Sequence, residues 1–274
     1  MARLSAKVSR HIFLGVDQTG AIDVRRGAET KNSLHRSVKA KPLPCCWITS
    51  QVVEFGELAD FNLRSLQETL GFSSNAVRMQ VAIDAVLGLP RSHPMPWRTA
   101  ILEAGAVEGL GREVAEAFFS DLARELPIGD DGLRTIDRKV GAMSVFQSKP
   151  YQRNVQTGTF RVWRDLGRDP HWFFVPELEN KSSGIPIFEA YPSYSWFQIL
   201  GMRRRSPELL SNWLKSESNL GLKWTSEHQR LVEKSPDHAD AFVIALALLL
   251  KNGEMSDTQR SNEGWILGVP RDSL

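Results

Sequence analysis

The chain has 274 residues, of which 42% are hydrophobic and 24% are charged. These proportions are typical of globular proteins and exclude a disordered or fibrous chain, and the length is enough to bury a core without disulfides or a structural metal. The 34 basic and 32 acidic residues leave a formal net charge of +2, which excludes the large basic excess of many nucleic-acid-binding proteins. Any contact with phosphates must therefore use local basic clusters.

The cysteines and the longest apolar run indicate the compartment. The only two cysteines, Cys45 and Cys46, are neighbours, and a disulfide between neighbours is strained, so they predict buried thiols in a reducing compartment. The longest apolar run, residues 239–250, contains Asp240 and is shorter than the roughly 20 residues that span a bilayer. The N-terminal apolar stretch is too short for a secretion signal. We therefore expect a cytoplasmic protein with no membrane association.

The N-terminal part of the sequence predicts strands. Residues 12–24 predict a strand, a tight turn and a second strand, because two apolar runs flank turn-forming residues. Residues 45–49 predict a third strand with a continuation at 52–55. Apolar residues then recur at helical spacing over 58–70, and Gly71 is placed to end that helix.

The middle of the chain combines one clear strand with a mixed segment. Residues 81–90 form an apolar run that carries Asp84 and closes on glycine and proline, a pattern typical of a strand buried on both faces. Residues 92–183 have helical spacing at 107–126 and are otherwise rich in aromatic residues and arginine. We expect a largely helical insertion or cap within a single domain over residues 1–274.

The C-terminal part predicts one further strand and several helices. Residues 186–192 predict a short strand that holds Glu189, and 193–200 predict a helical turn. Serine followed by proline then opens two helices, over 207–214 and from Asp237 to residue 251. The second is apolar nearly all round, so we expect it to be buried.

Acidic residues recur inside or at the ends of these apolar elements. An ionised carboxylate in an apolar element costs several kcal/mol unless it is paired, so the recurrence requires an explanation. Two of the acids are three residues apart at the start of the last helix and share one face. The five acids are Asp17, Asp84, Glu189, Asp237 and Asp240.

These acids are the ligand type that a hard cation prefers. Mg²⁺ and Mn²⁺ bind oxygen ligands, whereas zinc favours His and Cys, which are not clustered near the acids. Two such ions about 4 Å apart can activate a water and stabilise the leaving oxygen of a phosphodiester. The sequence therefore predicts a site for Mg²⁺ or Mn²⁺ in which the five acids are both metal ligands and catalytic residues.

Each acid also has a structural alternative. Asp17 can accept hydrogen bonds within the following turn, and Asp237 can act as a favourable negative charge at a helix start. Glu189 can pair with an arginine of the insertion. Asp84 and Asp240 are harder to explain this way, because apolar residues flank each of them on both sides.

Four segments carry a family resemblance. They are residues 15–17 (Gly-Val-Asp), 83–90 (Ile-Asp-Ala-Val-Leu-Gly-Leu-Pro), 188–192 (Phe-Glu-Ala-Tyr-Pro) and 237–241 (Asp-His-Ala-Asp-Ala). In this order they resemble an uncharacterised family of predicted nucleases with a ribonuclease-H-like fold, and the last segment is similar to the Asp-x-x-Asp helix of RuvC-type junction resolvases. The resemblance implies an α/β fold with a mixed five-stranded sheet flanked by helices, and a two-metal phosphodiesterase site built from the five acids.

Local basic clusters supply candidate contacts to the substrate, and residues 203–205 form a further run of three arginines. Arginine and lysine interleaved with aromatic residues suit binding of single-stranded nucleic acid, although solvated surface arginines are the commoner explanation. The candidates in the insertion are Arg134, Arg138, Lys139, Arg161 and Arg164.

Three function classes remain open. The first is a metal-dependent nuclease that acts on DNA or RNA. The second is a phosphotransferase of the same fold, an ATPase or a sugar-kinase-like enzyme, because residues 15–20 faintly resemble a phosphate loop. The third is a non-catalytic binding protein in which arginines neutralise the acids. The sequence does not fix the oligomeric state, and a dimer is compatible with it.

Overall fold

The strands of the computed structural model form one main sheet and one small sheet. The structure describes residues 10–18, 22–24, 38–72, 77–146, 153–176, 178, 183–251 and 263–270. Its strands are β1 (Arg10–Val16), β2 (Ile22–Val24), β3 (Val38–Ala40), β4 (Leu43–Thr49), β5 (Val52–Leu58), β6 (Val77–Ile83), β7 (Phe173–Phe174) and β8 (Ile185–Glu189). The main sheet has six strands in the order β5-β4-β1-β6-β8-β7, and β2 pairs with β3 separately.

The main sheet is mixed. β1, β4 and β5 form an antiparallel meander, with Gly15 opposite Cys46 and Trp47 opposite Glu54. β6 runs parallel to β1, and β8 runs parallel to β6 and β7. The carboxyl ends of β1, β6 and β8 therefore lie together at one edge, where crevices of α/β sheets commonly bind ligands.

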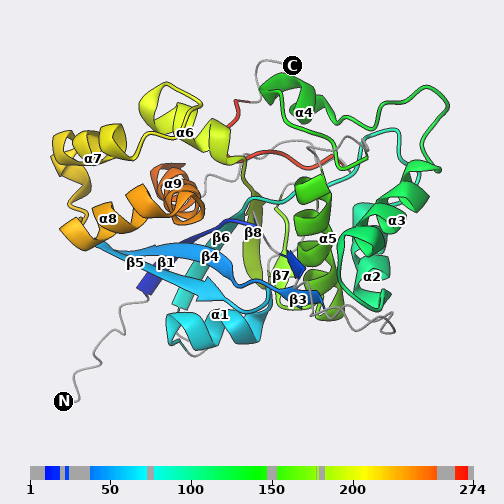
Figure 1. Cartoon of the computed structure of the whole chain (residues 1–274), viewed down its shortest axis with the longest axis horizontal. Helices are drawn as coiled ribbons and strands as arrows, with labels where there is room; N and C mark the ends of the chain where they lie inside the picture. Colours follow the sequence, from blue (N-terminus) through cyan, green and yellow to red (C-terminus); the bar gives the residue numbers. More distant parts are fainter. Residues whose placement is uncertain are drawn as a thin grey trace, which may run out of the picture.

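Helices cover both faces of this sheet (Figure 1). One face carries α1 (Leu63–Leu70), α2 (Trp97–Ala106), α3 (Arg112–Ala123) and α5 (Arg153–Arg168), and the other carries α6 (Pro192–Leu200), α7 (Pro207–Ser216), α8 (Ser226–Lys234) and α9 (Pro236–Lys251). The short α4 (Thr135–Val140) contributes to a small cluster with the C-terminal Ile266 and Val269. The α/β class expected from the sequence is confirmed.

Side-chain alternation along the strands explains the two layers. Ile12, Leu14 and Val16 of β1 point into the cluster with α2, α3 and α5. Phe13 points to the opposite face, where Gly15 also lies. A Cβ at Gly15 would come within 2.2 Å of the Ala241 carbonyl oxygen, so only glycine lets α9 pack directly on β1.

The segment 92–183 carries α2, α3, α4, α5 and β7. It is largely helical, as the sequence predicts, but it also adds β7 to the edge of the sheet beside β8. Phe160 and Trp163 of α5 lie in the same apolar cluster as the residues of β1. The segment thus shares its core with the sheet.

Several expected boundaries differ in the structure. The main sheet has six strands instead of five, because two residues of the segment 92–183 pair with β8. β6 begins at Val77 and ends at Ile83, so Asp84 follows the strand and does not lie inside it. The expected turn at residues 18–20 lies partly outside the described residues. Among the described residues, no helix combines the length and apolar character needed to cross a membrane.

Candidate functional site

The candidate site lies at the carboxyl ends of three neighbouring parallel strands. Val16, the last residue of β1, pairs with Ile83, the last residue of β6, and Ile83 pairs with Glu189 at the end of β8. The Asp84 amide donates to the Val16 carbonyl over 3.0 Å, which places Asp84 beside Asp17. Strand register alone therefore brings three of the sequence-predicted acids to one edge of the sheet.

Asp17 and Asp84 form a carboxyl pair. Their side chains are hydrogen-bonded to each other, and Asp17 is fully buried. Burial raises the pKa of Asp84 well above its ordinary value, and the negative charges of Asp17, Asp240 and Glu189 raise it further. Two carboxyl groups this close favour a proton shared between them over two ionised carboxylates.

The first turns of α9 bring two more acids toward the pair. Asp240 is buried, and its Oδ1 accepts hydrogen bonds of 2.8 Å from Trp196 Nε1 and from Arg205 Nε. Arg205 Nη2 donates to Oδ2 of the same carboxylate. Asp237 is partly buried, and its pKa is raised mainly by that burial, while Arg205 opposes the shift. Asp240 is therefore already neutralised by an arginine.

Glu189 is held in a buried network with an arginine of the segment 92–183. Its Oε1 lies 2.5 Å from Arg134 Nη2, and its Oε2 accepts from Arg134 Nη1 at 2.6 Å and from the Leu87 amide at 2.7 Å. Arg134 also binds Asp137, with 2.6 Å between Nη2 and Oδ1. About three of the roughly four acceptor positions of the Glu189 carboxylate are thus taken. Glu189 thus pairs with an arginine of the segment 92–183, which is the structural role that the sequence offered as an alternative to metal binding.

The basic residues expected to contact phosphates are placed differently. Arg134 is 1% exposed, Arg161 is 0% exposed and Arg164 is 8% exposed, so the expectation of a solvent-facing contact is wrong for these three. Two of them are engaged by backbone carbonyls of segments between the helices and strands: Arg161 donates to the carbonyls of Lys41 and Ala59, and Arg164 donates to the carbonyl of Gly109.

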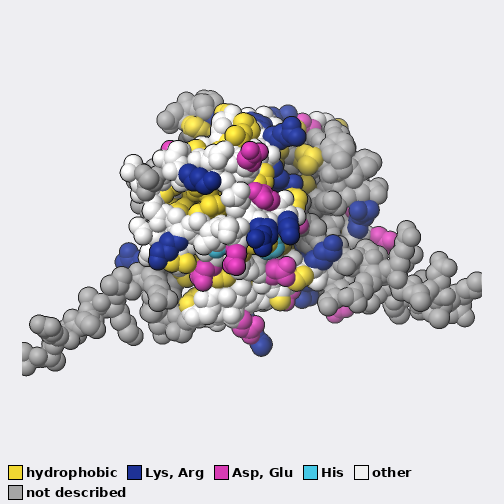
Figure 2. Space-filling model, turned by 60° about the vertical axis from the view of Figure 1, so that its left-hand side comes forward, with side chains coloured by type: hydrophobic (Ala, Val, Ile, Leu, Met, Phe, Trp, Pro, Cys, Tyr) yellow, Lys and Arg dark blue, Asp and Glu magenta, His cyan; other side chains and the backbone are white. Residues whose placement is uncertain are grey.

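The other two basic candidates lie on α4. Arg138 is exposed and pairs with Asp131 over 2.5 Å. Lys139 lies 5.6 Å from the centre of the Trp265 ring and donates to the Pro270 carbonyl. On the face drawn in Figure 2, basic and acidic side chains are interspersed and form no continuous basic field.

The five acids only partly fit a metal centre. In the described part of the chain, no group of three or more His, Cys, Asp or Glu side chains is arranged to hold a metal ion. The arginines explain this, since Arg134 and Arg205 engage the oxygens of Glu189 and Asp240. Asp17 and Asp84 do fit a hard cation, because two neighbouring carboxylates supply the oxygen ligands that such an ion prefers. Glu189 does not fit as a metal ligand, because Arg134 and the Leu87 amide already bind its carboxylate oxygens.

Sequence reasoning did not anticipate two residues that shape this site. Trp196 of α6 orients Asp240 through its indole N–H, and Arg205, known from the sequence only as part of a basic run, binds both oxygens of the same acid. The sequence pattern around Asp240 predicts neither partner, because Trp196 and Arg205 lie in segments that α7 and α8 separate from α9. A buried carboxylate at residue 240 does, however, require some partner.

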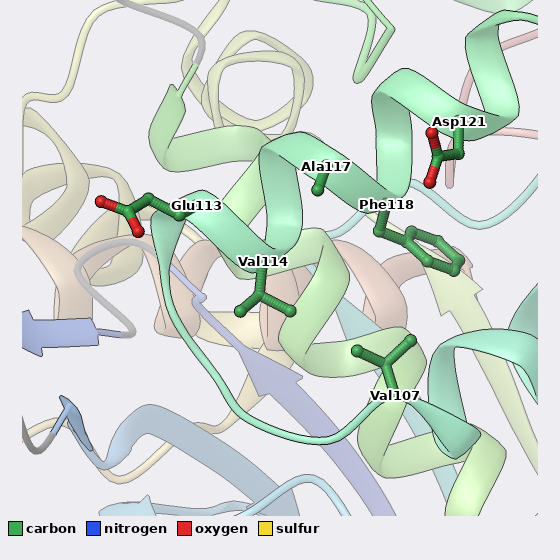
Figure 3. A pocket seen from close by; sticks show the side chains of 6 residues that line it. All are labelled: Val107, Glu113, Val114, Ala117, Phe118 and Asp121. Carbon is green, nitrogen blue, oxygen red and sulfur yellow. The ribbon is translucent and has the colours of Figure 1, made fainter. Parts of the chain in front are cut away.

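A separate cavity lies away from the acids. It has a volume of about 430 Å³ and is lined by Val107, Glu113, Val114, Ala117, Phe118 and Asp121. Figure 3 shows that its residues come from α3 and from the end of α2, with Phe118 and the two valines around the space. None of the five acids lines this cavity, so it does not belong to the candidate site.

We compared the chain with models of protein families, with curated proteins and with solved structures, and none of the three comparisons finds a match. The function is therefore inferred from the geometry of the site.

The Arg134 network generates a first prediction. Replacing Arg134 with methionine leaves the carboxylates of Glu189 and Asp137 buried without their shared cation, which we expect to lower the free energy of unfolding by about 3–5 kcal/mol. Urea denaturation measures the loss. Arg138→Gln is the matched control on the same helix, because it breaks only an exposed ion pair, and we expect it to leave the denaturation midpoint nearly unchanged. Equal effects of the two substitutions would contradict the structural role of Arg134.

The carboxyl pair generates a second prediction. Folding raises the pKa of Asp84, so the folded protein keeps a proton that the unfolded chain loses above the ordinary pKa of 3.8. Stability therefore decreases as pH rises from that value to the raised pKa, by up to about 1.4 kcal/mol per pH unit for one proton. We expect Asp84→Asn to remove this decrease and to be more stable than the parent above that range.

Denaturation at a series of pH values measures the effect. Asp131→Asn is the control, because Asp131 is exposed and its pKa is lowered by the Leu133 amide and by Arg138. This variant should retain the decrease in stability seen in the parent. If Asp84→Asn and the parent lose stability in parallel, the shared proton is not at Asp84.

Proposed function

We propose that this protein is a metal-dependent nuclease that hydrolyses phosphodiester bonds of DNA or RNA with Mg²⁺ or Mn²⁺. The observation that carries the proposal is the placement of Asp17 and Asp84 side by side, fixed by strand register and by the 3.0 Å hydrogen bond from the Asp84 amide to the Val16 carbonyl. Asp17 is fully buried and Asp84 is partly buried, and the charges of Asp240 and Glu189 also act on Asp84. A fold that only needed stability would not gather acids in this way, since like charges in a buried site are unfavourable. A divalent cation offsets this cost.

The strand arrangement supports a ribonuclease-H-like fold. The antiparallel meander β5-β4-β1 is followed in the sheet by the parallel strands β6 and β8, and a helix with an Asp-x-x-Asp start packs on β1. A mixed sheet flanked by helices is what the resemblance of the sequence segments implies. Fold alone does not establish function, so the acids remain the basis of the proposal.

The residues of the chain have distinct roles in this proposal. Asp17 and Asp84 bind the cation, and strand register fixes their separation. Asp240 is a third ligand, held in place by the indole of Trp196, and Asp237 lies one turn before it at the more exposed rim. When bound, the cation supplies an activated water and stabilises charge on the phosphodiester oxygens.

Glu189 acts as a positioning residue in this scheme. Its carboxylate accepts the Leu87 amide over 2.7 Å and so fixes the segment that follows Asp84. Arg134 holds the carboxylate in turn, which connects the segment 92–183 to the acids. Glu189 therefore contributes to the geometry of the site without binding the cation.

A second candidate function is a non-catalytic binding protein of the same fold. The observation that favours it is the pairing of two of the five acids with arginines, Glu189 with Arg134 and Asp240 with Arg205. In that case the acids stabilise the fold and no cation is required. The two candidates differ in their response to Mn²⁺.

The nuclease proposal predicts that Mg²⁺ or Mn²⁺ raises the melting temperature and supports cleavage of single- or double-stranded nucleic acid. At a free ion concentration of about 100 times Kd, the stabilisation is about 2.7 kcal/mol. Asp17→Asn and Asp84→Asn should abolish both effects, because each removes a charged ligand. Calorimetry in the presence and absence of the ion and a gel assay of cleavage measure them.

Asp131→Asn is the control for the loss of one carboxylate, since Asp131 is exposed and pairs with Arg138 on α4. It should bind the ion and cleave as the parent does. The proposal is wrong if Asp84→Asn binds Mn²⁺ and cleaves as well as the parent. If the ion changes neither melting nor cleavage in any variant, the non-catalytic candidate is favoured.

A further inference from the structure

Arg205 is a partly exposed cation that binds one of the acids of the candidate site. Its Nε donates to Asp240 Oδ1 over 2.8 Å, and its Nη2 donates to Asp240 Oδ2. Asp17 and Asp237 are near enough for their negative charges to act on the same guanidinium. We propose that Arg205 is an exchangeable counter-ion, which occupies the carboxylate of Asp240 in the metal-free protein and leaves it when a divalent cation binds. This inference rests on the proposed function, because it assigns a residue that sets the metal affinity of that site.

The unequal burial of the two partners supports exchange. The Asp240 side chain is 3% exposed, whereas that of Arg205 is 45% exposed. The guanidinium can therefore turn into solvent and be hydrated there, while the carboxylate cannot. Asp240 would be left buried and unpaired, which is unfavourable unless another cation takes the place of the arginine. The guanidinium of Arg205 therefore leaves Asp240 only when a metal ion takes its place, because the buried carboxylate needs a positive charge beside it.

Asp240 itself does not need to move. Trp196 Nε1 donates to Oδ1 from the buried side, so the carboxylate keeps its orientation when Arg205 leaves. Position 240 is also fixed by α9, which packs on β1 through Gly15. The exchange consequently requires a change in one flexible side chain only.

The location of Arg205 in the chain is compatible with this change. It lies in the non-helical segment 201–206 between α6 and α7. The backbone of this segment is held independently, since Arg203 donates to the Val140 carbonyl and Gly201 ends α6 in the left-handed conformation at φ 71°. The arginine can leave Asp240 without unfolding of the segment.

The contrast with Arg134 makes the assignment specific. Arg134 is 1% exposed and binds Glu189, Asp137 and the Glu263 carbonyl together. Its departure would break several buried hydrogen bonds at once, so Arg134 is a fixed partner. Of these two arginines, only Arg205 binds a buried carboxylate while its own side chain is partly exposed to solvent.

Titration with Mn²⁺ alone tests the inference. We expect Arg205→Gln to bind Mn²⁺ about tenfold more tightly than the parent, because the ion no longer competes with a charge-assisted pair. The matched control is Arg204→Gln, which removes the same charge from the adjacent exposed position and should change the affinity by less than about twofold, as expected for a screened surface charge. Isothermal calorimetry gives the affinities, and the Mn²⁺-dependent rise in melting temperature should be larger for Arg205→Gln.

Arg205→Lys is a second variant in case the glutamine variant fails to fold, since it keeps the charge but loses the two-pronged contact. Its Mn²⁺ affinity should lie between those of the parent and Arg205→Gln. If Mn²⁺ binds the parent and either Arg205 variant binds it equally or more weakly, Arg205 does not compete with the metal, and the inference is wrong while the proposed function stands. If Mn²⁺ binds neither the parent nor any variant, both are wrong.

Discussion

The structure is organised by the need to balance negative charge at the carboxyl ends of β1, β6 and β8. Parallel register places Asp17, Asp84 and Glu189 at one edge of the sheet, and α9 adds Asp237 and Asp240. Arg134 neutralises Glu189 and Arg205 neutralises Asp240, while burial and the closeness of Asp17 raise the pKa of Asp84. The ion pairs of the two arginines cover Glu189, Asp137 and Asp240, but no ion pair is observed for Asp84 within the described ranges of the chain. This shortage of positive charge is the physical basis for expecting a divalent cation.

The segment 92–183 contributes directly to this edge of the sheet. Arg134 at the start of α4 reaches Glu189, and Thr159 and Trp163 of α5 bind the amide and the carbonyl of Val86, two residues after Asp84. Gly158 also allows Gln18 to pack against α5, because a Cβ there would overlap the Gln18 side chain. The segment therefore fixes the backbone on both sides of the Asp17 and Asp84 pair, and a change within it can alter the site from a distance.

The sequence predicted the α/β class, a strand that ends at Asp17, a strand over 186–192 that contains Glu189, and the buried helix that begins near Asp237, because each follows from local periodicity and turn residues. In the structure the second of these strands ends at Glu189. The sequence placed Asp84 inside a strand because the apolar run continues to Pro90, whereas the strand ends at Ile83. Hydrophobicity does not distinguish a buried strand from a buried loop. The six residues of α4 and the pairing of β7 were missed because short elements depend on tertiary contacts.

The acids of the site were predictable, and so was the kind of partner that Glu189 has, but the particular arginines were not. Apolar flanking residues made Asp84 and Asp240 conspicuous, but the arginines that bind Glu189 and Asp240 are 55 and 35 residues away in sequence. Arg161 and Arg164 show the same limit, since an arginine in an aromatic segment serves equally well as a core hydrogen-bond donor or as a phosphate contact. Partner choice is a property of the folded chain.

The most direct test of the central claim is a crystal structure of the protein soaked in Mn²⁺, examined for anomalous scattering. We expect a peak bound by the carboxylates of Asp17 and Asp84, with the guanidinium of Arg205 turned away from Asp240. A structure at saturating Mn²⁺ without a peak at these residues, in which Asp17 and Asp84 remain bonded to each other, would contradict it.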